Sequence, residues 1–329
     1  MTPDEAAPAR GSFVRNQAEA LRRLGVDVDY FDFPVGKSHY LPAARRIRRM
    51  LNENHYDLVH AHYGLAGWSA KFAGAKPLVV TFHGTDVRHR IVGLLSRILS
   101  RRIELAAGAS AALFAPENGR PGLKPSKGRS RRRTAVLPCG ADTDLFRPLP
   151  RDEARRRLGL DPDGRYLFFP ASPARPVKRF DLATRLAEAA DAEILTAGNR
   201  PAEEMPLWMN AANAVVVTSD NEGFGLAAVE ALACDVPLLS TPVGVAPVLA
   251  GNIDGCHVGE WDEDSWVAAV KPHLDKPDPR VKGRDKALAY SADAMARRVL
   301  LAYEDLLDPD RIKPEPVTPP HGSATTTGQ

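Results

Sequence analysis

The chain has 329 residues, of which 44% are hydrophobic and 26% are charged, as is usual for a globular protein with two domains of ordinary size. No apolar run reaches the ~18–20 residues of a membrane-spanning helix, and no secretion-signal pattern opens the chain. The three cysteines stand at unrelated spacings, which favours a reducing cytosol and argues against a metal site. Residues 1–150 hold 24 Lys and Arg against 13 Asp and Glu (+11), and residues 151–329 hold the remaining 20 and 28 (−8), so we expect the first half to face an anionic partner.

The first half of the chain alternates helix and strand patterns. Apolar side chains at helical spacing predict a helix over 12–24 that stops at Gly25, and alternation predicts a strand over 26–33. A basic helix is predicted over 41–54. Three strands that end in loops are then predicted in "DLVHAHY", "PLVVTFHGTD" and "TAVLPCGADTDLF".

A second series of strands and helices begins near Arg151, in "RYLFFPAS", "DLATRLAEAAD", "AEILTAG", "NAVVVTS", "GLAAVEALA" and "VPLLSTP". Apolar strands that alternate with helices indicate parallel sheets covered on both faces. We therefore predict an α/β protein of two doubly wound, Rossmann-like domains that face a cleft, 1–148 and 149–285. A helix over 286–310 is expected to pack back towards the first domain, and 311–329 to be a disordered tail.

One strand is missing from this pattern. A doubly wound domain normally opens with a strand that lies in the middle of its sheet. No apolar run precedes Gly11. We therefore expect the first strand of the first domain to be absent from this chain, and that domain to be marginally stable.

The stretch "NEGFGLAAVE", residues 221–230, lies where a buried strand passes into a helix. In an open parallel sheet, ligands bind outside the carboxyl ends of the strands. Gly223 and Gly225 allow the backbone to approach a ligand. The amides near Phe224, Gly225 and Leu226 open the helix and can hold anionic or hydroxyl oxygens.

Two glutamates stand eight apart in this stretch. A carboxylate accepts two hydrogen bonds at once, which suits Glu230 to the paired hydroxyls of a ribose and Glu222 to those of a sugar ring. The alternative is a solvated helix glutamate and an amino-terminal charge that the helix dipole favours.

The segment "NEGFGLAAVEALACDVPLLSTPVG" resembles the signature of the family-four retaining glycosyltransferases, which have two Rossmann domains (the GT-B type). Further resemblance, in the same order as in the family, lies in "PARGSFVRNQAEALRRLGVDVDYF", "LVHAHYGLAGWSAKFAGAKPLVVTFHGTD", "VLPCGADTDLFRP" and "PASPARPVKRFDLA". It covers about residues 8–306. Within the family, the chain is similar to the subgroup of teichuronic-acid and other surface-polysaccharide synthesis.

The resemblance implies a role for each matching residue. Catalytic roles fall to His83, Lys178 and Glu222, and donor binding to Gly11, Arg175, Arg179, Gly223, Phe224, Gly225, Leu226 and Glu230. No metal or cofactor is expected, because a lysine, its arginine neighbours and a helix start can stabilise the leaving diphosphate. The family usually has Gly-Arg where this chain has Ala171-Ser172. This difference leaves open which of Arg175, Lys178 and Arg179 binds the diphosphate and which assists its departure.

The resemblance implies transfer of a sugar, with retention, from a UDP- or GDP-linked donor to a saccharide or lipid-linked acceptor, in cell-surface polysaccharide or glycolipid synthesis. Two alternatives stay open: a nucleotide-sugar 2-epimerase on the same fold, and a non-catalytic binding relative. Nucleic acid is not expected as a partner, because aromatic residues are few and not interleaved with basic ones.

Three basic segments of the first half, 44–51, 88–102 and 119–133, mix arginine with aliphatic residues or form a basic loop. They suit a cytoplasmic protein that docks on the anionic inner face of the cytoplasmic membrane. The alternative is a solvated basic surface. His60 and His62 are expected on opposite faces of a strand end.

Overall fold

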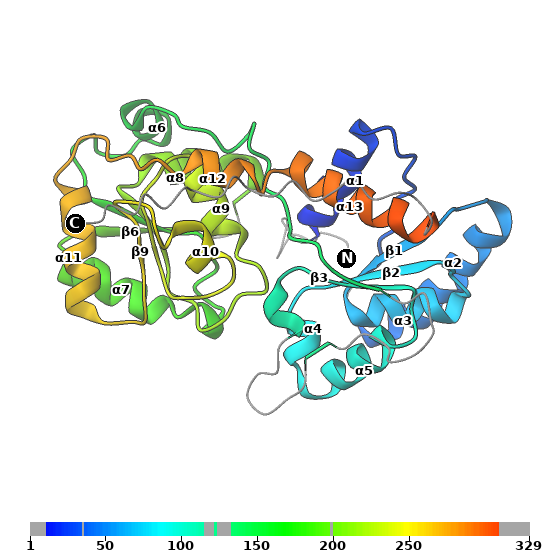
Figure 1. Cartoon of the computed structure of the whole chain (residues 1–329). Helices are drawn as coiled ribbons and strands as arrows, with labels where there is room; N and C mark the ends of the chain where they lie inside the picture. The colour runs from blue at the N-terminus through cyan, green and yellow to red at the C-terminus, as the bar shows by residue number, and fades with distance from the viewer. Residues whose placement is uncertain (1–10, 35, 115–121, 124–132, 198–199, 309–329) are drawn as a thin grey trace, which may run out of the picture.

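The computed structural model describes residues 11–34, 36–114, 122–123, 133–197 and 200–308. Two α/β domains stand side by side, and the chain crosses between them twice (Figure 1). The predicted fold class is confirmed. The expected tail over 311–329 lies outside the described residues, as does most of the basic segment 119–133.

The first domain holds a parallel sheet in which neighbouring strands follow chain order. Its strands are β1 (Val59–His62), β2 (Leu78–Phe82), β3 (Leu105–Gly108) and β4 (Arg133–Val136). The second and third of these strands are wholly buried, as expected for a sheet covered on both faces. The helices are α1 (Ser12–Arg23), α2 (Tyr40–Glu53), α3 (Gly64–Ala73), α4 (Thr85–Arg88) and α5 (Arg90–Ser100), with short 3₁₀ turns at Lys37–His39 and Ala111–Phe114.

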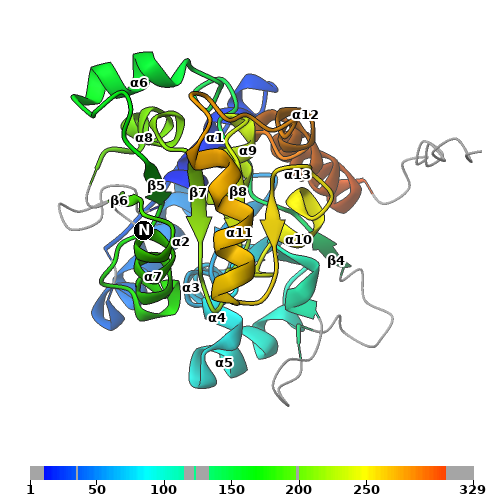
Figure 2. The same ribbon diagram turned by 90° about the vertical axis from the view of Figure 1, so that its left-hand side faces the viewer.

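The second domain holds a parallel sheet in the order β6-β5-β7-β8-β9. Its strands are β5 (Tyr166–Phe169), β6 (Glu193–Thr196), β7 (Ala214–Val217), β8 (Leu238–Ser240) and β9 (His257–Val258). The helices are α6 (Arg151–Leu158), α7 (Phe180–Ala189), α8 (Met205–Ala211), α9 (Leu226–Ala233), α10 (Ala246–Ala250), α11 (Glu263–Leu274) and α12 (Arg284–Leu288), with 3₁₀ turns at Pro176–Lys178 and Ala202–Glu204. Two of them, α7 and α11, cover one face of the sheet (Figure 2).

The predicted carboxyl-terminal helix is two helices, α12 and α13 (Ala292–Leu307). The chain breaks at Ser291, whose hydroxyl accepts a hydrogen bond from the Ala294 amide at 3.1 Å and so caps α13. The second of the two helices packs on α1, and Val299 and Tyr303 belong to the same buried cluster as Leu21 (Figure 1). The end of the described chain is therefore part of the first domain.

The strand predicted over 26–33 does not form. This segment has no regular secondary structure and pairs with no strand of the described sheet. Val26 and Val28 nevertheless pack against the cluster that α1 and α13 share. The prediction was wrong because a strand needs a neighbour with which to pair, and alternation of side chains does not supply one. No helix of the described residues is long and apolar enough to cross a membrane.

Candidate active site

The two domains meet where the loops after β2 and β7 touch. A Cβ atom built on Gly223 would lie 1.9 Å from the carbonyl oxygen of His83, and one built on Gly84 would lie 3.0 Å from the Gly223 Cα. Backbone therefore packs against backbone, and only glycine fits at position 223. The contact brings the carboxyl ends of the two sheets together, which is where ligands of such sheets bind.

Glu222 and Lys178 form an ion pair beside this contact. One oxygen of the carboxylate also accepts a hydrogen bond from the Ser219 hydroxyl at 2.9 Å. From the first domain, the Arg88 guanidinium donates to the Glu222 carbonyl at 3.2 Å. The lysine and glutamate side chains are only 12% and 16% exposed. Two residues predicted as catalytic thus form one charged unit next to the junction of the domains.

The structure distinguishes the two arginines that flank Lys178. The Arg179 guanidinium donates to Asp181 at 2.8 Å and to Asp220 at 3.1 Å, and these carboxylates raise its pKa. Its backbone lies in the left-handed region at a φ of 50°. Arg175 is exposed. Two carboxylates already bind the Arg179 guanidinium, whereas Arg175 is a surface cation at the same turn.

The loop before α9 has a shape fixed by glycine. Gly225 adopts a φ of 90° at the amino end of the helix, a conformation that costs glycine nothing. The preceding carbonyl, that of Phe224, accepts a hydrogen bond from the Val245 amide at 2.8 Å. Phe224 itself is buried and packs against Tyr290, so the loop is held from both sides. Leu226 opens the helix, and these predicted donor-binding residues form one continuous turn.

Glu230 lies in α9, partly buried. Removal from solvent raises the pKa of its carboxyl group to about 7. Within the described parts of the chain, no side chain or amide hydrogen-bonds to this carboxylate. A carboxyl group that is partly removed from solvent and has no hydrogen-bond partner destabilises the fold when it is charged, unless a ligand supplies hydrogen bonds.

We expect the Glu230→Gln variant to be more stable than the wild type above pH 7, by about 2 kcal/mol. The pKa of Glu230 is higher in the folded state than its ordinary value of 4.5. Protonated Glu230 therefore contributes its full share to the free energy of unfolding below pH ~4.5, and this contribution is lost as the pH rises through about 7. Melting curves at pH 4.5 and pH 8 measure the difference. Glu188→Gln, on an exposed surface, is the matched control, and an equal gain at both pH values would contradict the assignment.

Three histidines form a stacked cluster behind the domain junction. The rings of His60 and His62 lie 4.5 Å apart, and those of His62 and His83 lie 5.3 Å apart. His62 Nδ1 and His83 Nε2 are hydrogen-bonded at 3.0 Å. Burial lowers the pKa of His60 and His83 to about 3 and that of His62 well below its usual value, so the cluster is neutral near pH 7. No set of three His, Cys, Asp or Glu side chains in the described chain is arranged to hold a metal ion.

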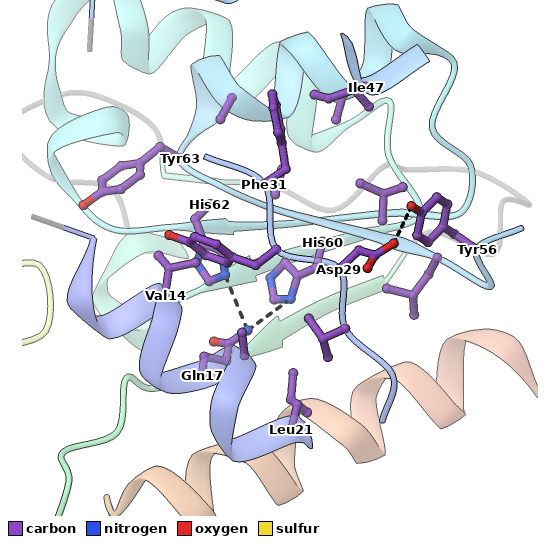
Figure 3. A pocket seen from close by; sticks show the side chains of 18 of the residues that line it. Val14, Gln17, Leu21, Asp29, Phe31, Ile47, Tyr56, His60, His62 and Tyr63 are labelled. Carbon is purple, nitrogen blue, oxygen red and sulfur yellow. Dashed lines mark hydrogen bonds between the residues drawn. The ribbon is translucent and has the colours of Figure 1, made fainter. Parts of the chain in front are cut away.

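The prediction that His60 and His62 point to opposite faces was wrong. Residues two apart along a strand share a face. Both rings contact the side-chain amide of Gln17, at 3.3 and 3.4 Å (Figure 3). The ring nitrogen of His60 that contacts Gln17, Nδ1, is also hydrogen-bonded to the Tyr303 hydroxyl at 2.6 Å, and Nε2 is hydrogen-bonded to the Thr81 hydroxyl at 2.8 Å. The pair therefore connects α1 with α13.

His83 reaches the domain junction through its backbone, while its ring turns into the first domain. The ring centroid lies 4.7 Å from that of Phe13 and 4.7 Å from that of Tyr63. Cys139 Sγ lies 3.9 Å from its Nδ1. Gly11 opens α1 close by, at a φ of 76°, and is buried. Of the predicted site residues, these two lie on the first-domain side.

The sequence did not identify two residues of this site, Asp86 and Arg88. The buried Asp86 carboxylate accepts hydrogen bonds from the amides of His83 at 2.9 Å, Gly84 at 3.0 Å and Gly64 at 2.9 Å. Burial nevertheless raises its pKa to about 6. The aspartate three residues after the histidine in "HGTD" is a turn-capping pattern that could have indicated this role. No local signal could have identified Arg88, because its partners belong to the other domain.

Comparisons with known proteins agree with this architecture. Residues 11–145 match the family model of Glycosyltransferase Family 4, and residues 173–276 match that of Glycosyl transferases group 1. Among curated proteins, the D-inositol 3-phosphate glycosyltransferase of Thermobispora bispora is 27% identical, over 86% of this chain and 78% of that protein. The protein of the same name from Geodermatophilus obscurus is 27% identical, over 83% of this chain and 71% of that protein.

Solved structures show the same fold at lower identity. Sucrose-phosphate synthase from Thermosynechococcus elongatus superposes with a TM-score of 0.69 at 17% identity, covering 91% of this chain and 94% of the other. HepE of Anabaena, solved with UDP and glucose, superposes with a TM-score of 0.63 at 18% identity, covering 87% and 88%. The predicted surface-polysaccharide subgroup is not the one that the curated relatives name. Each matched segment lies within one of the two domains: the first domain is similar to the family 4 model and the second to the group 1 model. With the curated relatives, these matches show that the chain is a glycosyltransferase.

Proposed function

We propose that this glycosyltransferase moves a sugar from a nucleoside-diphosphate donor to a hydroxyl of a phosphate-bearing acceptor, with retention of configuration. The observation that carries the proposal is the Lys178–Glu222 ion pair beside the glycine turn that opens α9, with the unpartnered Glu230 carboxyl in the same helix.

Each of these groups suits one part of a nucleotide sugar. Lys178, Arg175 and the amides at the start of α9 can neutralise the diphosphate as it leaves, and a metal ion is then unnecessary. Glu230 can accept hydrogen bonds from both ribose hydroxyls, and Glu222 can do so from the transferred sugar. Arg179, bound by two aspartates, shapes the loop that presents Lys178.

Two observations support a phosphate-bearing acceptor. The first half of the chain, whose loop at Gly84 touches the glycine turn of the second domain, has a charge balance of +11. The curated relatives carry the name D-inositol 3-phosphate glycosyltransferase. A saccharide joined to lipid through a diphosphate, which is one form of the lipid-linked acceptor that the resemblance implies, also carries phosphate. The two acceptor classes share this chemistry and differ in size and apolar content.

The test begins with the donor. Melting curves with UDP and GDP, in the presence of a chelator, are expected to show stabilisation by one of them. The matching nucleotide sugars are then incubated with D-inositol 3-phosphate, with a diphosphate-lipid-linked saccharide, or with neutral inositol, and the anomeric configuration of the product is read by NMR. Transfer to either phosphate-bearing acceptor supports the proposal. Transfer to neutral inositol alone, or epimerised donor without acceptor, contradicts it.

We also expect salt-sensitive binding to anionic vesicles through α5. Ile91 and Leu94 stand one turn apart on this helix, 67% and 54% exposed, between Arg90 and Arg97. Apolar side chains framed by cations suit the surface of an anionic leaflet, where each basic residue contributes roughly 1 kcal/mol. Co-sedimentation with phosphatidylserine vesicles should fall at least about tenfold in Ile91→Asp/Leu94→Asp. Val248→Asp, an exposed residue of the second domain, is the control, and equal sedimentation with neutral vesicles would contradict the expectation.

A further inference from the structure

Arg88 is a residue of the first domain that contacts the second domain beside the proposed donor site. It is the last residue of the short helix α4, in the loop after β2. Its Nη1 donates to the side-chain oxygen of Asn221 at 2.5 Å and to the backbone carbonyl of Glu222 at 3.2 Å. Both acceptors are uncharged oxygens. The contact therefore depends on a hydrogen-bond donor at position 88 more than on its net charge.

The loop that carries Arg88 is held in place within the first domain. The buried Asp86 carboxylate accepts hydrogen bonds from three backbone amides, one of which lies at the start of α3. The Ser96 hydroxyl of α5 donates to the Asp86 carbonyl at 2.6 Å. On the same helix, a Cβ atom built on Gly93 would lie 2.1 Å from the Val87 carbonyl oxygen, so α5 packs directly against α4. Arg88 therefore reaches the second domain from a fixed base.

On its own side of the contact, the second domain ties two turns together. One turn, residues 218–222, carries Glu222, and the other is the 3₁₀ turn that carries Lys178. The Thr218 hydroxyl donates to the Lys178 carbonyl at 3.0 Å, and the Asp220 amide donates to the 3₁₀ turn at 2.9 Å. The ion pair between Glu222 and Lys178 closes this connection. A shift of the turn 218–222 would therefore move both charged groups.

Arg88 contacts the part of this turn from which the Glu222 side chain projects. A hydrogen bond to the backbone carbonyl of a residue restricts where its side chain can lie. Displacement of a group by ~1 Å is sufficient to slow a reaction about 100-fold. The contact also forms only when the two domains are this close. It therefore couples the approach of the domains to the geometry of the charged pair.

We propose that Arg88 is a positioning residue for sugar transfer, which holds the turn 218–222 from the first domain and so places Glu222 and Lys178 when the domains are together. The inference rests on the roles proposed above for this charged pair. Arg88 acts through Glu222 and not by contact with the donor. Its loss should slow transfer and leave the binding of the nucleoside diphosphate to the second domain intact.

The test compares Arg88→Met with Arg88→Lys, two unbranched side chains of which only lysine can donate a hydrogen bond. Arg88→Met should lower kcat about 10- to 100-fold, while the dissociation constant of the nucleoside diphosphate changes less than about threefold. Arg88→Lys should recover part of this loss, because its ammonium can donate to one of the two oxygens. Arg156→Met, which replaces an exposed arginine of α6, is the matched control and should keep the wild-type kcat.

A double-mutant cycle tests the contact from the other domain. Asn221→Ala removes one of the two acceptors, so its loss of kcat should be smaller than that of Arg88→Met. The double variant should have the kcat of Arg88→Met alone, because the second change removes an acceptor whose donor is already gone. Losses that multiply would show that the two residues act independently and would overturn the proposal. Asn221→Ala leaves the first domain unchanged, so its effect tests the contact even if Arg88→Met is unstable.

The same assays separate this proposal from the one on which it rests. Lys178→Ala is measured beside the Arg88 variants. Wild-type kcat in Lys178→Ala would overturn both the proposed role of the charged pair and that of Arg88. A large loss in Lys178→Ala with wild-type kcat in Arg88→Met would overturn the role of Arg88 alone.

Discussion

Replacement of Lys178 by alanine is expected to lower kcat by roughly 100- to 1000-fold while the KM for the donor changes less than about tenfold. Charge develops on the diphosphate as the sugar leaves, so a cation at this position acts mainly in the transition state. In the wild type, Lys178 neutralises the Glu222 carboxylate. The variant leaves this negative charge uncompensated beside the diphosphate. Steady-state kinetics with the nucleotide sugar identified by melting curves measures both constants.

Arg179→Ala is the matched control for this prediction. Its charge belongs to the same turn, but Asp181 and Asp220 already bind the guanidinium. We expect a kcat within about tenfold of the wild type, because removing a cation that is already paired changes the field at the diphosphate little. If Lys178→Ala raises only the KM, the lysine binds the donor without assisting departure. If both variants lose the same activity, the different roles proposed here for Lys178 and Arg179 are wrong.

The Gly223→Ala variant is expected to lose about 100-fold or more of its kcat/KM without losing stability. The added methyl group would lie 1.9 Å from the carbonyl oxygen of His83, which is backbone and cannot rotate away. The domains must therefore separate at this point, and the groups of the two halves of the site move apart. Misplacement of reacting groups by ~1 Å is sufficient for a loss of this size.

Three measurements separate this effect from a folding defect. The melting temperature should stay within about 2 °C of the wild type, because position 223 is not part of either core. Binding of the nucleoside diphosphate to the second domain should persist. Gly259→Ala adds a methyl group that meets only the His257 side chain, at 3.2 Å, and should leave activity unchanged. Wild-type turnover in Gly223→Ala would show that the contact between the loops is not needed for transfer.

Local patterns predicted most of the secondary structure. The helix at 12–24, the buried strands and the glycine turn at 223–226 followed from side-chain spacing and from the backbone freedom of glycine. The segment 26–33 failed because its partner strand is a property of the sheet and not of the segment. The break at Ser291 was missed because serine tolerates a helix and a cap alike, and packing on α1 decides between them.

The sequence by itself determined the fold class and the two-domain plan, and it supplied the residues that we propose for the donor site, because these depend on periodicity and on motifs within about ten residues of each other. Only the tertiary structure decided how the charged groups pair. Lys178 and Glu222 are 44 residues apart, and Arg88 and Glu222 are 134 apart, so no local pattern could connect them. The same holds for His60 and Tyr303, 243 residues apart, since α13 reaches the first domain only after the chain has built the second. Contacts between distant segments are set by how the sheets and helices pack.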